Sequence, residues 1–199
     1  MSVATAEELF VNELKDIYSA EKQAVKAFPR LTKAVQSDEL KQAMQEHLEQ
    51  TKGQIERLDR IFEILDKRSS GKTCDGMKGL VTEAQSQVEE IERGPVLDCA
   101  MIGALQRIEH YEIAAYGTVA TLAEAMGQDE IKELLGETLE EEKETDERLT
   151  QVAQSVNSDA INEAEEGETS DEDDESEKPS TQRSSSKSNS SVSARKSKR

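Results

Sequence analysis

Apolar residues recur in steps of three and four along four long stretches of the chain, and this spacing places them on one face of an α-helix. In the first stretch they stand at Phe10, Leu14, Ile17, Ala24, Phe28, Leu31 and Val35. The chain has few prolines and no tryptophan, and it is rich in residues that favour helices. These features predict an all-α protein with helices over 5–35, 38–67, 77–92, 95–126 and 128–156.

The segments between the helices predict how they are connected. Ser37 is expected to cap the second helix, and Gly127 is a stop signal at the end of the fourth. The first pair and the last pair are joined tightly, whereas the middle connection is long enough to cross a bundle. This pattern is typical of a four-helix bundle with one long crossover and a short extra helix. Pro29 is expected to bend or divide the first helix, because it removes a backbone donor.

The residues from Ser158 onward differ in composition from the rest of the chain. They begin acidic, end rich in serine and basic residues, and include few apolar side chains. We therefore expect a helical domain over 1–157 and a disordered tail over 158–199, which cannot bury enough apolar surface to offset chain entropy. The tail is expected to be a solubilising appendage, with weak contact to an anion, DNA or a partner as the alternative.

Charge and hydropathy exclude several functional classes. The formal net charge of -18 argues against a nucleic-acid groove in the helical domain. No apolar run is long enough to cross a membrane, and the first residues lack the regions of a signal peptide, so a cytoplasmic location is expected. Cys74 and Cys99 have no metal-ligand spacing and no secretory context, and we expect no disulfide between them.

Polar residues interrupt the apolar face of every long helix near its middle. The inward ionisable residues are Glu21, His47, Glu109 (at the edge of its stripe), Glu112, Glu142 and Asp146. In the second helix Thr51 and Gln54 also point inward, and Gln50 lies near the margin. Several buried carboxylates at one level would repel each other unless cations held them together. Because carboxylates and imidazole suit iron or manganese, the sequence predicts a metal site in the bundle core.

A plainer interpretation exists for each of these positions. An inward Glu is usually half-exposed near a helix end or paired with a base, and Glu is abundant here. The metal interpretation rests on acids of three helices and His47 standing at matched depth. His110 is expected on the surface. Tyr18 and Tyr111 are expected to pack in the ordinary way, with hydrogen bonds to the acids as the alternative.

Four segments of the chain together resemble the YciF/YciE-type stress-protein family, a branch of the ferritin-like superfamily distantly related to rubrerythrin. They are NELKDIYSAEKQ, EHLEQTKGQIERLDRIFE, QRIEHYEIAAYGTVATLAE and ETLEEEKETDERL, and the resemblance covers about residues 5–156. It implies a ferritin-like four-helix bundle, a homodimer and a di-metal site.

The resemblance also implies ligands. Glu21 matches the acid of the first helix, Glu109 and Glu112 match the paired acids of the fourth, and Glu142 matches the acid of the last. Asp146 stands where rubrerythrin-like proteins have a histidine.

The second helix departs from the superfamily pattern. His47 stands where that pattern has a Glu, and Gln50 stands where it has a His. A neutral amide binds metal poorly beside charged alternatives. A mononuclear or low-affinity site is therefore the alternative to a di-metal site.

Two functions remain open at this point. The first is a dimeric ferritin-like protein that binds iron or manganese and reacts with oxygen or peroxide during stress, which would make it a di-metal oxidoreductase. The second is a non-enzymatic dimeric scaffold that holds a partner, with a degraded or empty metal site. Iron storage in a shell is disfavoured, because the sequence supplies no evidence of cage-forming contacts.

Overall fold

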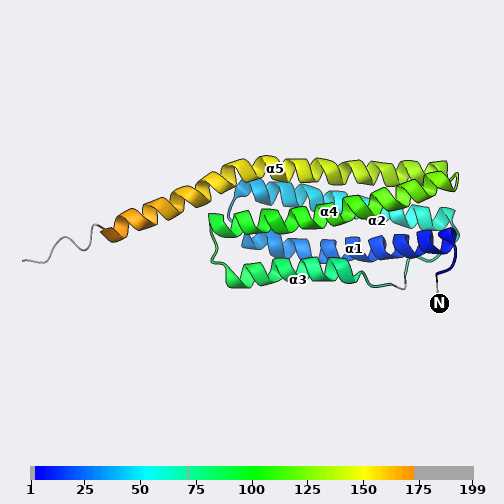
Figure 1. Ribbon diagram of the computed structural model, residues 1–199, viewed down its shortest axis with the longest axis horizontal. Coiled ribbons are helices and arrows are strands. Elements are labelled where there is room, and N and C mark those ends of the chain that lie inside the picture. The colour runs from blue at the N-terminus through cyan, green and yellow to red at the C-terminus, as the bar shows by residue number, and fades with distance from the viewer. Residues whose placement is uncertain (1–2, 71, 173–199) are drawn as a thin grey trace, which may run out of the picture. The chain divides into compact units, whose positions relative to one another are not determined.

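The computed structural model describes residues 3–70 and 72–172, and these residues form five helices (Figure 1). The helices are α1 (Ala6–Ala34), α2 (Asp38–Ile64), α3 (Asp75–Glu90), α4 (Pro95–Ala125) and α5 (Asp129–Glu172). Within the described residues there is no strand. The predicted all-α bundle with one long crossover and a short extra helix is confirmed.

The helix ends follow local sequence signals. Thr5 and Glu8 form a capping box at the start of α1, and the Ser37 side chain accepts a hydrogen bond from the Leu40 N–H at the start of α2. Gly127 ends α4 with a φ of 68°, a conformation that favours glycine. Each of these caps satisfies backbone groups that a helix leaves unpaired at its ends.

Pro29 does not divide the first helix, which is continuous from Ala6 to Ala34. Pro29 lies on the exposed side of α1, whereas its neighbours Phe28 and Leu31 are fully buried. We infer that packing of these two side chains outweighs the backbone hydrogen bond that proline removes.

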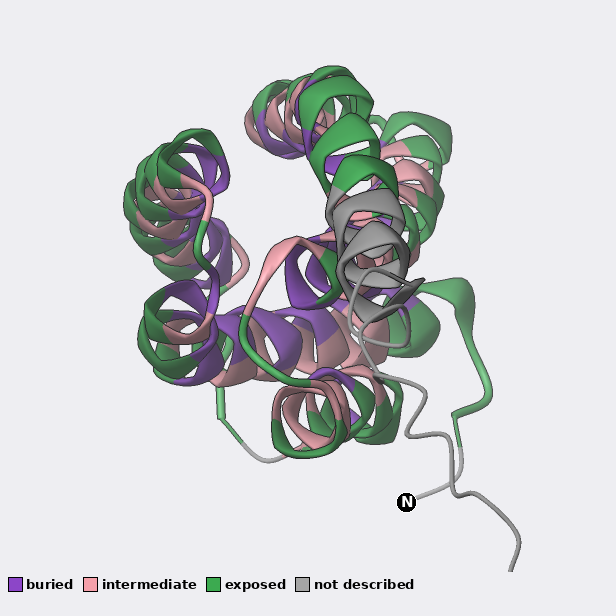
Figure 2. Ribbon diagram, turned by 90° about the vertical axis from the view of Figure 1, so that its left-hand side faces the viewer, coloured by how far each residue is buried: buried purple, intermediate pink, exposed green. Residues whose placement is uncertain are grey.

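Two apolar clusters fill the bundle, one near each end. The first contains the C-terminal half of α1, the N-terminal halves of α2 and α4, and Leu149, Val152 and Val156 of α5. The second contains the opposite halves of α1, α2 and α4, with Ile131 and Leu135 of α5. This distribution makes α1 and α5 run one way and α2 and α4 the other. The buried sides of the helices face one another in the end-on view of Figure 2.

The crossover between α2 and α4 carries α3, which packs against α1 and α4. Met77 and Ala84 of α3 join the first apolar cluster, and Arg30 of α1 forms an ion pair with Glu89 at 3.0 Å. Because α2 and α4 are parallel, the chain must return along the bundle between them, and α3 covers much of that length (Figure 1).

The last helix continues beyond its expected end at 156, as far as Glu172. Residues 157–172 contain several Ala and Glu, which are good helix formers. The first compact unit ends at Ala164. The expected boundary at 157 stays a prediction, and the part of the predicted tail from 173 onward lies outside the described residues.

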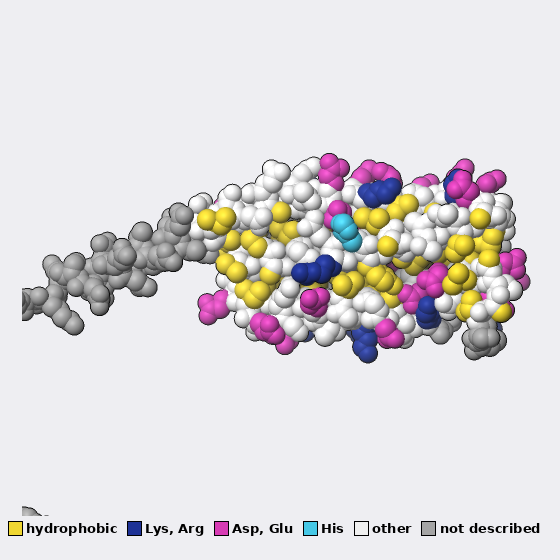
Figure 3. All heavy atoms as spheres, viewed as in Figure 1, with side chains coloured by type: hydrophobic (Ala, Val, Ile, Leu, Met, Phe, Trp, Pro, Cys, Tyr) yellow, Lys and Arg dark blue, Asp and Glu magenta, His cyan; other side chains and the backbone are white. Residues whose placement is uncertain are grey.

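Charged and apolar side chains both lie on the surface, as the face drawn in Figure 3 shows. Acidic side chains are spread over the face shown in Figure 3, with basic and apolar side chains among them. Both cysteines are free, Cys74 buried and Cys99 half-buried. Among the helices of the described part, none is long and apolar enough to span a membrane.

The contact of α3 with α4 depends on a glycine. A Cβ added at Gly76 would lie 2.9 Å from Cε2 of Tyr111, closer than such atoms approach. We expect Gly76→Ala to lower the free energy of unfolding by about 1–3 kcal/mol, as overpacking does. Gly79→Ala is the matched control, because its Cβ would meet nothing within 4 Å. It should raise stability by about 0.5–1 kcal/mol. Urea denaturation measures both, and equal effects of the two changes would refute this contact.

Candidate metal centre

A layer of polar side chains separates the two apolar clusters at mid-bundle. Each of the four long helices contributes to this layer, at the point along the helix where the residues of one apolar cluster end and those of the other begin. The buried members are Glu21 of α1, His47, Thr51 and Gln54 of α2, Glu109 and Glu112 of α4, and Glu142 of α5. The layer therefore lies at the depth that the sequence predicts.

Four of the predicted residues converge on one point. His47, Glu109, Glu112 and Glu142 each offer a ligand atom, and these atoms all lie within 4.8 Å of one another. His47 Nε2 lies 3.3 Å from Glu109 Oε1 and 3.9 Å from Glu142 Oε2. The group combines three carboxylates and one imidazole from three helices, a set that can hold a metal ion.

Glu21 lies in the same layer and is fully buried. Its Oε1 accepts a hydrogen bond of 2.5 Å from the hydroxyl of Tyr116, while its Oε2 has no partner. The charge of Glu142 disfavours ionisation of Glu21, and the charges of both residues disfavour ionisation of Glu109 and Glu112. Glu21 thus adds a fourth buried carboxylate beside the converging group.

Many buried polar atoms of this layer lack hydrogen-bond partners. They are Glu21 Oε2, His47 Nε2, Gln54 Oε1, both carboxylate oxygens of Glu109, Glu112 Oε1 and Glu142 Oε2. Leaving such atoms unpaired costs about 1–3 kcal/mol each, and more when they are charged. Unpaired acceptors that face one another are what a bound cation would satisfy, so the donor set fits a metal ion.

Burial disfavours the ionised forms of Glu109, Glu112 and His47. Burial, followed by the charge of Glu142, raises the pKa of Glu109 well above its usual value. Burial and the charge of Glu21 do the same to the pKa of Glu112. Burial lowers the pKa of His47, which keeps the imidazole neutral. A neutral imidazole is the form that binds metals.

Residues around the converging group hold it in position. Gln54 Nε2 donates to Glu142 Oε1 at 2.5 Å and to Glu141 Oε2 at 3.1 Å. Arg57 pairs with Glu141 and donates to the Thr138 hydroxyl at 2.7 Å. Together these contacts anchor α5 to α2 beside Glu142.

The imidazole of His47 is also fixed from α5. The Thr145 hydroxyl lies 3.2 Å from His47 Nδ1, and this contact leaves Nε2 facing the acids. Contacts of this kind set the orientation and tautomer of a metal-binding histidine.

Asp146 does not join the converging group. Its side chain is 24% exposed, accepts one hydrogen bond from Gln106 at 3.1 Å and lies 3.3 Å from His110 Nε2. His110 is 69% exposed, in agreement with its expected surface position. Thr145 and Asp146 are both half-buried, but it is the Thr145 side chain that lies next to His47.

Tyr116, the tyrosine that bonds to Glu21, was not predicted from the sequence as part of the site. Tyr116 stands one turn after Glu112 and shares its face, which is the signal that identifies it. Tyr18 instead packs edge-on against Phe62, with ring centroids 5.9 Å apart.

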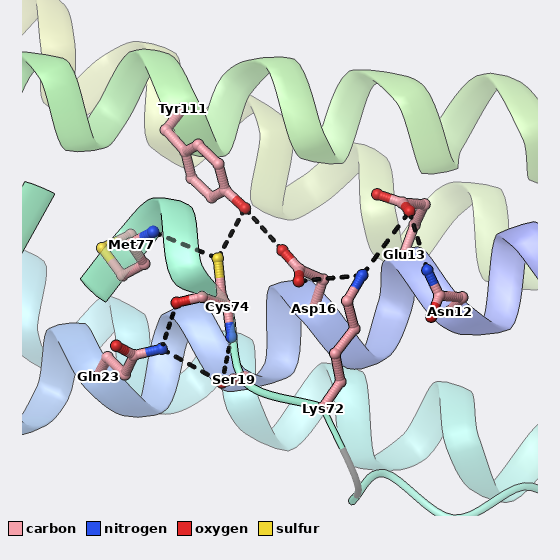
Figure 4. A network of polar contacts seen from close by, with 9 residues as sticks. All are labelled: Asn12, Glu13, Asp16, Ser19, Gln23, Lys72, Cys74, Met77 and Tyr111. Carbon is pink, nitrogen blue, oxygen red and sulfur yellow. Dashed lines mark hydrogen bonds and ion pairs between the residues drawn. The ribbon is translucent and has the colours of Figure 1, made fainter. Parts of the chain in front are cut away.

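Tyr111 serves another contact, at the junction of α1, α3 and α4 (Figure 4). Its hydroxyl donates to Asp16 at 2.7 Å and lies 2.8 Å from the Sγ of Cys74, and Lys72 pairs with Asp16 at 3.1 Å. Ser19 accepts a hydrogen bond from the Cys74 N–H. Tyr111 therefore ties the crossover to the bundle, and its hydroxyl bonds to Asp16 and Cys74 rather than to the acids of the mid-bundle layer.

Comparison with known proteins agrees with this architecture. The family described as Domain of unknown function (DUF892) matches residues 5–162. The chain belongs to this family.

Its similarity to individual members extends over most of the chain. It is 46% identical to Protein YciF of Escherichia coli (strain K12) over 166 residues, which are 82% of this chain and all of that protein. The crystal structure of the E. coli stress protein YciF matches with a TM-score of 0.74, covering 76% of this chain and 96% of the other.

Two further solved structures share the fold. YcfI of Rhodopseudomonas palustris is 41% identical, with a TM-score of 0.73, and the match covers 75% of this chain and 95% of YcfI. A protein of Xanthomonas campestris pv. campestris has a TM-score of 0.66 at 20% identity, covering 81% and 99% of the two chains, which shows a shared fold alone. The resemblance predicted from four segments of the sequence is confirmed.

The buried acids give the metal-free protein a defined pH dependence. Burial raises the pKa values of Glu21, Glu109 and Glu112 in the folded state, so the folded chain binds protons that the unfolded chain releases. The stability that these three acids contribute should therefore be greatest below the ordinary Glu pKa and fall as the pH rises through the raised values.

Urea denaturation of Glu112→Gln and the wild type, both with chelator, measures this dependence. Glu112→Gln removes one titrating acid, so its stability should fall less steeply with rising pH. Glu56→Gln, at an exposed position of α2, is the control and should keep the wild-type slope. His47 titrates in both proteins, so its opposite contribution cancels in the comparison. Parallel pH curves for Glu112→Gln and the wild type would refute the assignment.

Proposed function

We propose that this protein binds one or two iron or manganese ions in its mid-bundle layer and reacts with oxygen or peroxide. The observation that carries the proposal is the buried group of His47, Glu109, Glu112 and Glu142, whose facing oxygen and nitrogen atoms include several without a partner. Glu21 completes the proposed ligands. Asp146, which lies apart from this group, is not needed for them.

Charge balance supports binding of a cation. Glu21, Glu109, Glu112 and Glu142 would carry four negative charges when ionised, and the described residues place no Lys or Arg among the buried polar side chains. Two divalent ions would neutralise four carboxylates, while one ion would leave two acids to be held by protons. Buried charges are tolerated when they are paired or bind a metal.

Two amides bear on the number of ions. Gln50 is a neutral residue at the position where the superfamily pattern has a metal-binding His, and Gln54 donates a hydrogen bond to Glu142. Gln50 offers no charged ligand and Gln54 occupies one oxygen of Glu142, so fewer ligand atoms are available to a metal ion on the α2 side of the layer. A single ion held by His47, Glu109, Glu112 and Glu142 is therefore the alternative to a pair.

A bound iron or manganese ion would supply the redox chemistry. Residues of the chain would hold the ligands in position and exclude water. Thr145 orients His47, Tyr116 holds one oxygen of Glu21, and Gln54 holds one oxygen of Glu142. The apolar clusters on both sides of the layer keep bulk water away from the acids.

A non-enzymatic scaffold is the second candidate, and the Tyr116 and Gln54 hydrogen bonds favour it. Neutral donors stabilise these acids without any metal, and the raised pKa values of Glu21, Glu109 and Glu112 allow protons to take the place of cations. In this case the bundle would hold a partner through its acidic surface.

The cellular setting proposed here rests on the family. The E. coli relative is described as a stress protein. We extend to this chain a role in stress protection, a cytoplasmic location and a homodimeric state.

Metal analysis separates the two candidates. Protein purified without chelator should contain about one or two iron or manganese ions per chain by plasma mass spectrometry, as a site with these ligands requires. Glu112→Ala should lose them, because it removes a carboxylate from the converging group. Glu56→Ala, an exposed change on α2, should retain them.

Stability provides a second measurement. Excess Fe²⁺ or Mn²⁺ added anaerobically should raise the melting temperature of the wild type, because a ligand that binds the folded state stabilises it. Glu112→Ala should show no such rise. Absence of metal from the wild type, even after anaerobic addition of Fe²⁺, would refute the metal site and favour the scaffold.

A further inference from the structure

A small cavity lies next to the buried acids. Its volume is about 10 Å³, room for roughly one water molecule. The lining residues are Phe28, Ala43, Met44, His47, Leu105, Glu109, Thr145 and Leu149. Two of them, His47 and Glu109, belong to the converging group, and both have buried atoms without a partner.

A larger pocket of about 190 Å³ opens on the outside of the same two helices. Its lining residues are Ala43, Glu46 and Gln50 of α2 and Glu144, Thr145 and Arg148 of α5. Ala43 and Thr145 line both the outer pocket and the inner cavity. These two side chains are therefore the wall between the outer surface and the acids.

Polar groups continue from the mouth to the acids. Glu46 and Glu144 are exposed at the outer pocket, and Arg148 is paired with Glu39 at 3.4 Å. Inside them stands the Thr145 hydroxyl, 3.2 Å from His47 Nδ1. Acidic residues at the mouth concentrate cations there.

We propose that divalent cations reach the buried acids between α2 and α5, through a neck formed by Ala43 and Thr145. The proposal rests on the proposed function, since it supplies the access path of the same metal centre. The inner cavity is too small for a hydrated ion, so the neck must open transiently. The oxygens of Gln50 and Thr145 would then replace waters that the ion loses.

Another opening is less suited to this role. The pocket at the end of the bundle, about 370 Å³ in volume, is lined by residues such as Phe10, Leu65 and Met126. None of its lining residues belongs to the polar layer, and part of the second apolar cluster lies between them. Of these two openings, the one between α2 and α5 has a lining that reaches the acids.

The first test measures the effect of charge at the mouth. The full chain, freed of metal with chelator, is mixed with Co²⁺ alone in a stopped-flow instrument, and the visible absorption of bound Co²⁺ is followed. Replacing both Glu46 and Glu144 by Gln should slow loading by about tenfold at low ionic strength. The deficit should shrink as salt is raised, and the number of ions bound at equilibrium should stay the same.

A matched variant controls for net charge. Replacing Glu49 and Glu147 by Gln removes the same number of charges from exposed positions on the same two helices, outside the pocket lining. This control should load at the wild-type rate. If the two double variants load equally fast, the mouth does not guide cations and the proposal is overturned.

The second test narrows the neck. Ala43→Leu adds bulk where the two cavities meet, and it should slow loading by at least about tenfold while leaving the equilibrium stoichiometry unchanged. Loading at the wild-type rate would overturn the path. Should Ala43→Leu fail to fold, the charge variants alone decide. If the wild type itself binds no Co²⁺, the metal centre is refuted. If the wild type binds Co²⁺ but the variants load at the wild-type rate, the metal centre stands and only the path is refuted.

Discussion

The structure depends on a mid-bundle layer in which carboxylates of three helices and an imidazole of the fourth meet away from water. Apolar clusters on either side of the layer hold the helices together. The carboxylates of the layer would still repel one another when ionised, and only protons or cations can neutralise that charge. Burial raises the pKa of Glu109 and Glu112, and several acceptors have no partner, so the bundle alone leaves the layer unsatisfied. The metal proposal follows from this imbalance.

The surrounding contacts limit what the layer can become. Tyr116, Gln54 and Thr145 each engage one member of the layer, and Arg57 supports Gln54 indirectly through Glu141. These contacts fix the orientation of Glu21, Glu142 and His47, which would preorganise them for an ion. Tyr116 and Gln54 also donate hydrogen bonds that satisfy carboxylate oxygens without a metal, so the same residues serve both the metal and the scaffold hypotheses. The choice between them depends on affinity for cations.

The α2–α5 side of the layer combines several features. His47 and Gln50, the two residues that depart from the superfamily pattern, lie on this side. Gln54 and Thr145 also form their hydrogen bonds to Glu142 and His47 here. It is also where the outer pocket and the inner cavity share Ala43 and Thr145. Differences among relatives in this region would therefore alter both how many ions are held and how quickly they arrive.

The sequence by itself determined the helices, their crossover connection and the depth of the polar layer, because apolar periodicity and capping residues are local signals. It identified Glu21, His47, Glu109, Glu112 and Glu142 as inward for the same reason. It placed Asp146 inward on a stripe that runs from Glu142 to Leu149, whereas in the structure Thr145 contacts His47, and Asp146 contacts Gln106 and His110. Only the tertiary structure decided this, and only it paired Tyr116 with Glu21 and kept α1 continuous through Pro29. These outcomes depend on how packed helices are rotated against each other, and on burial energies that local sequence does not contain.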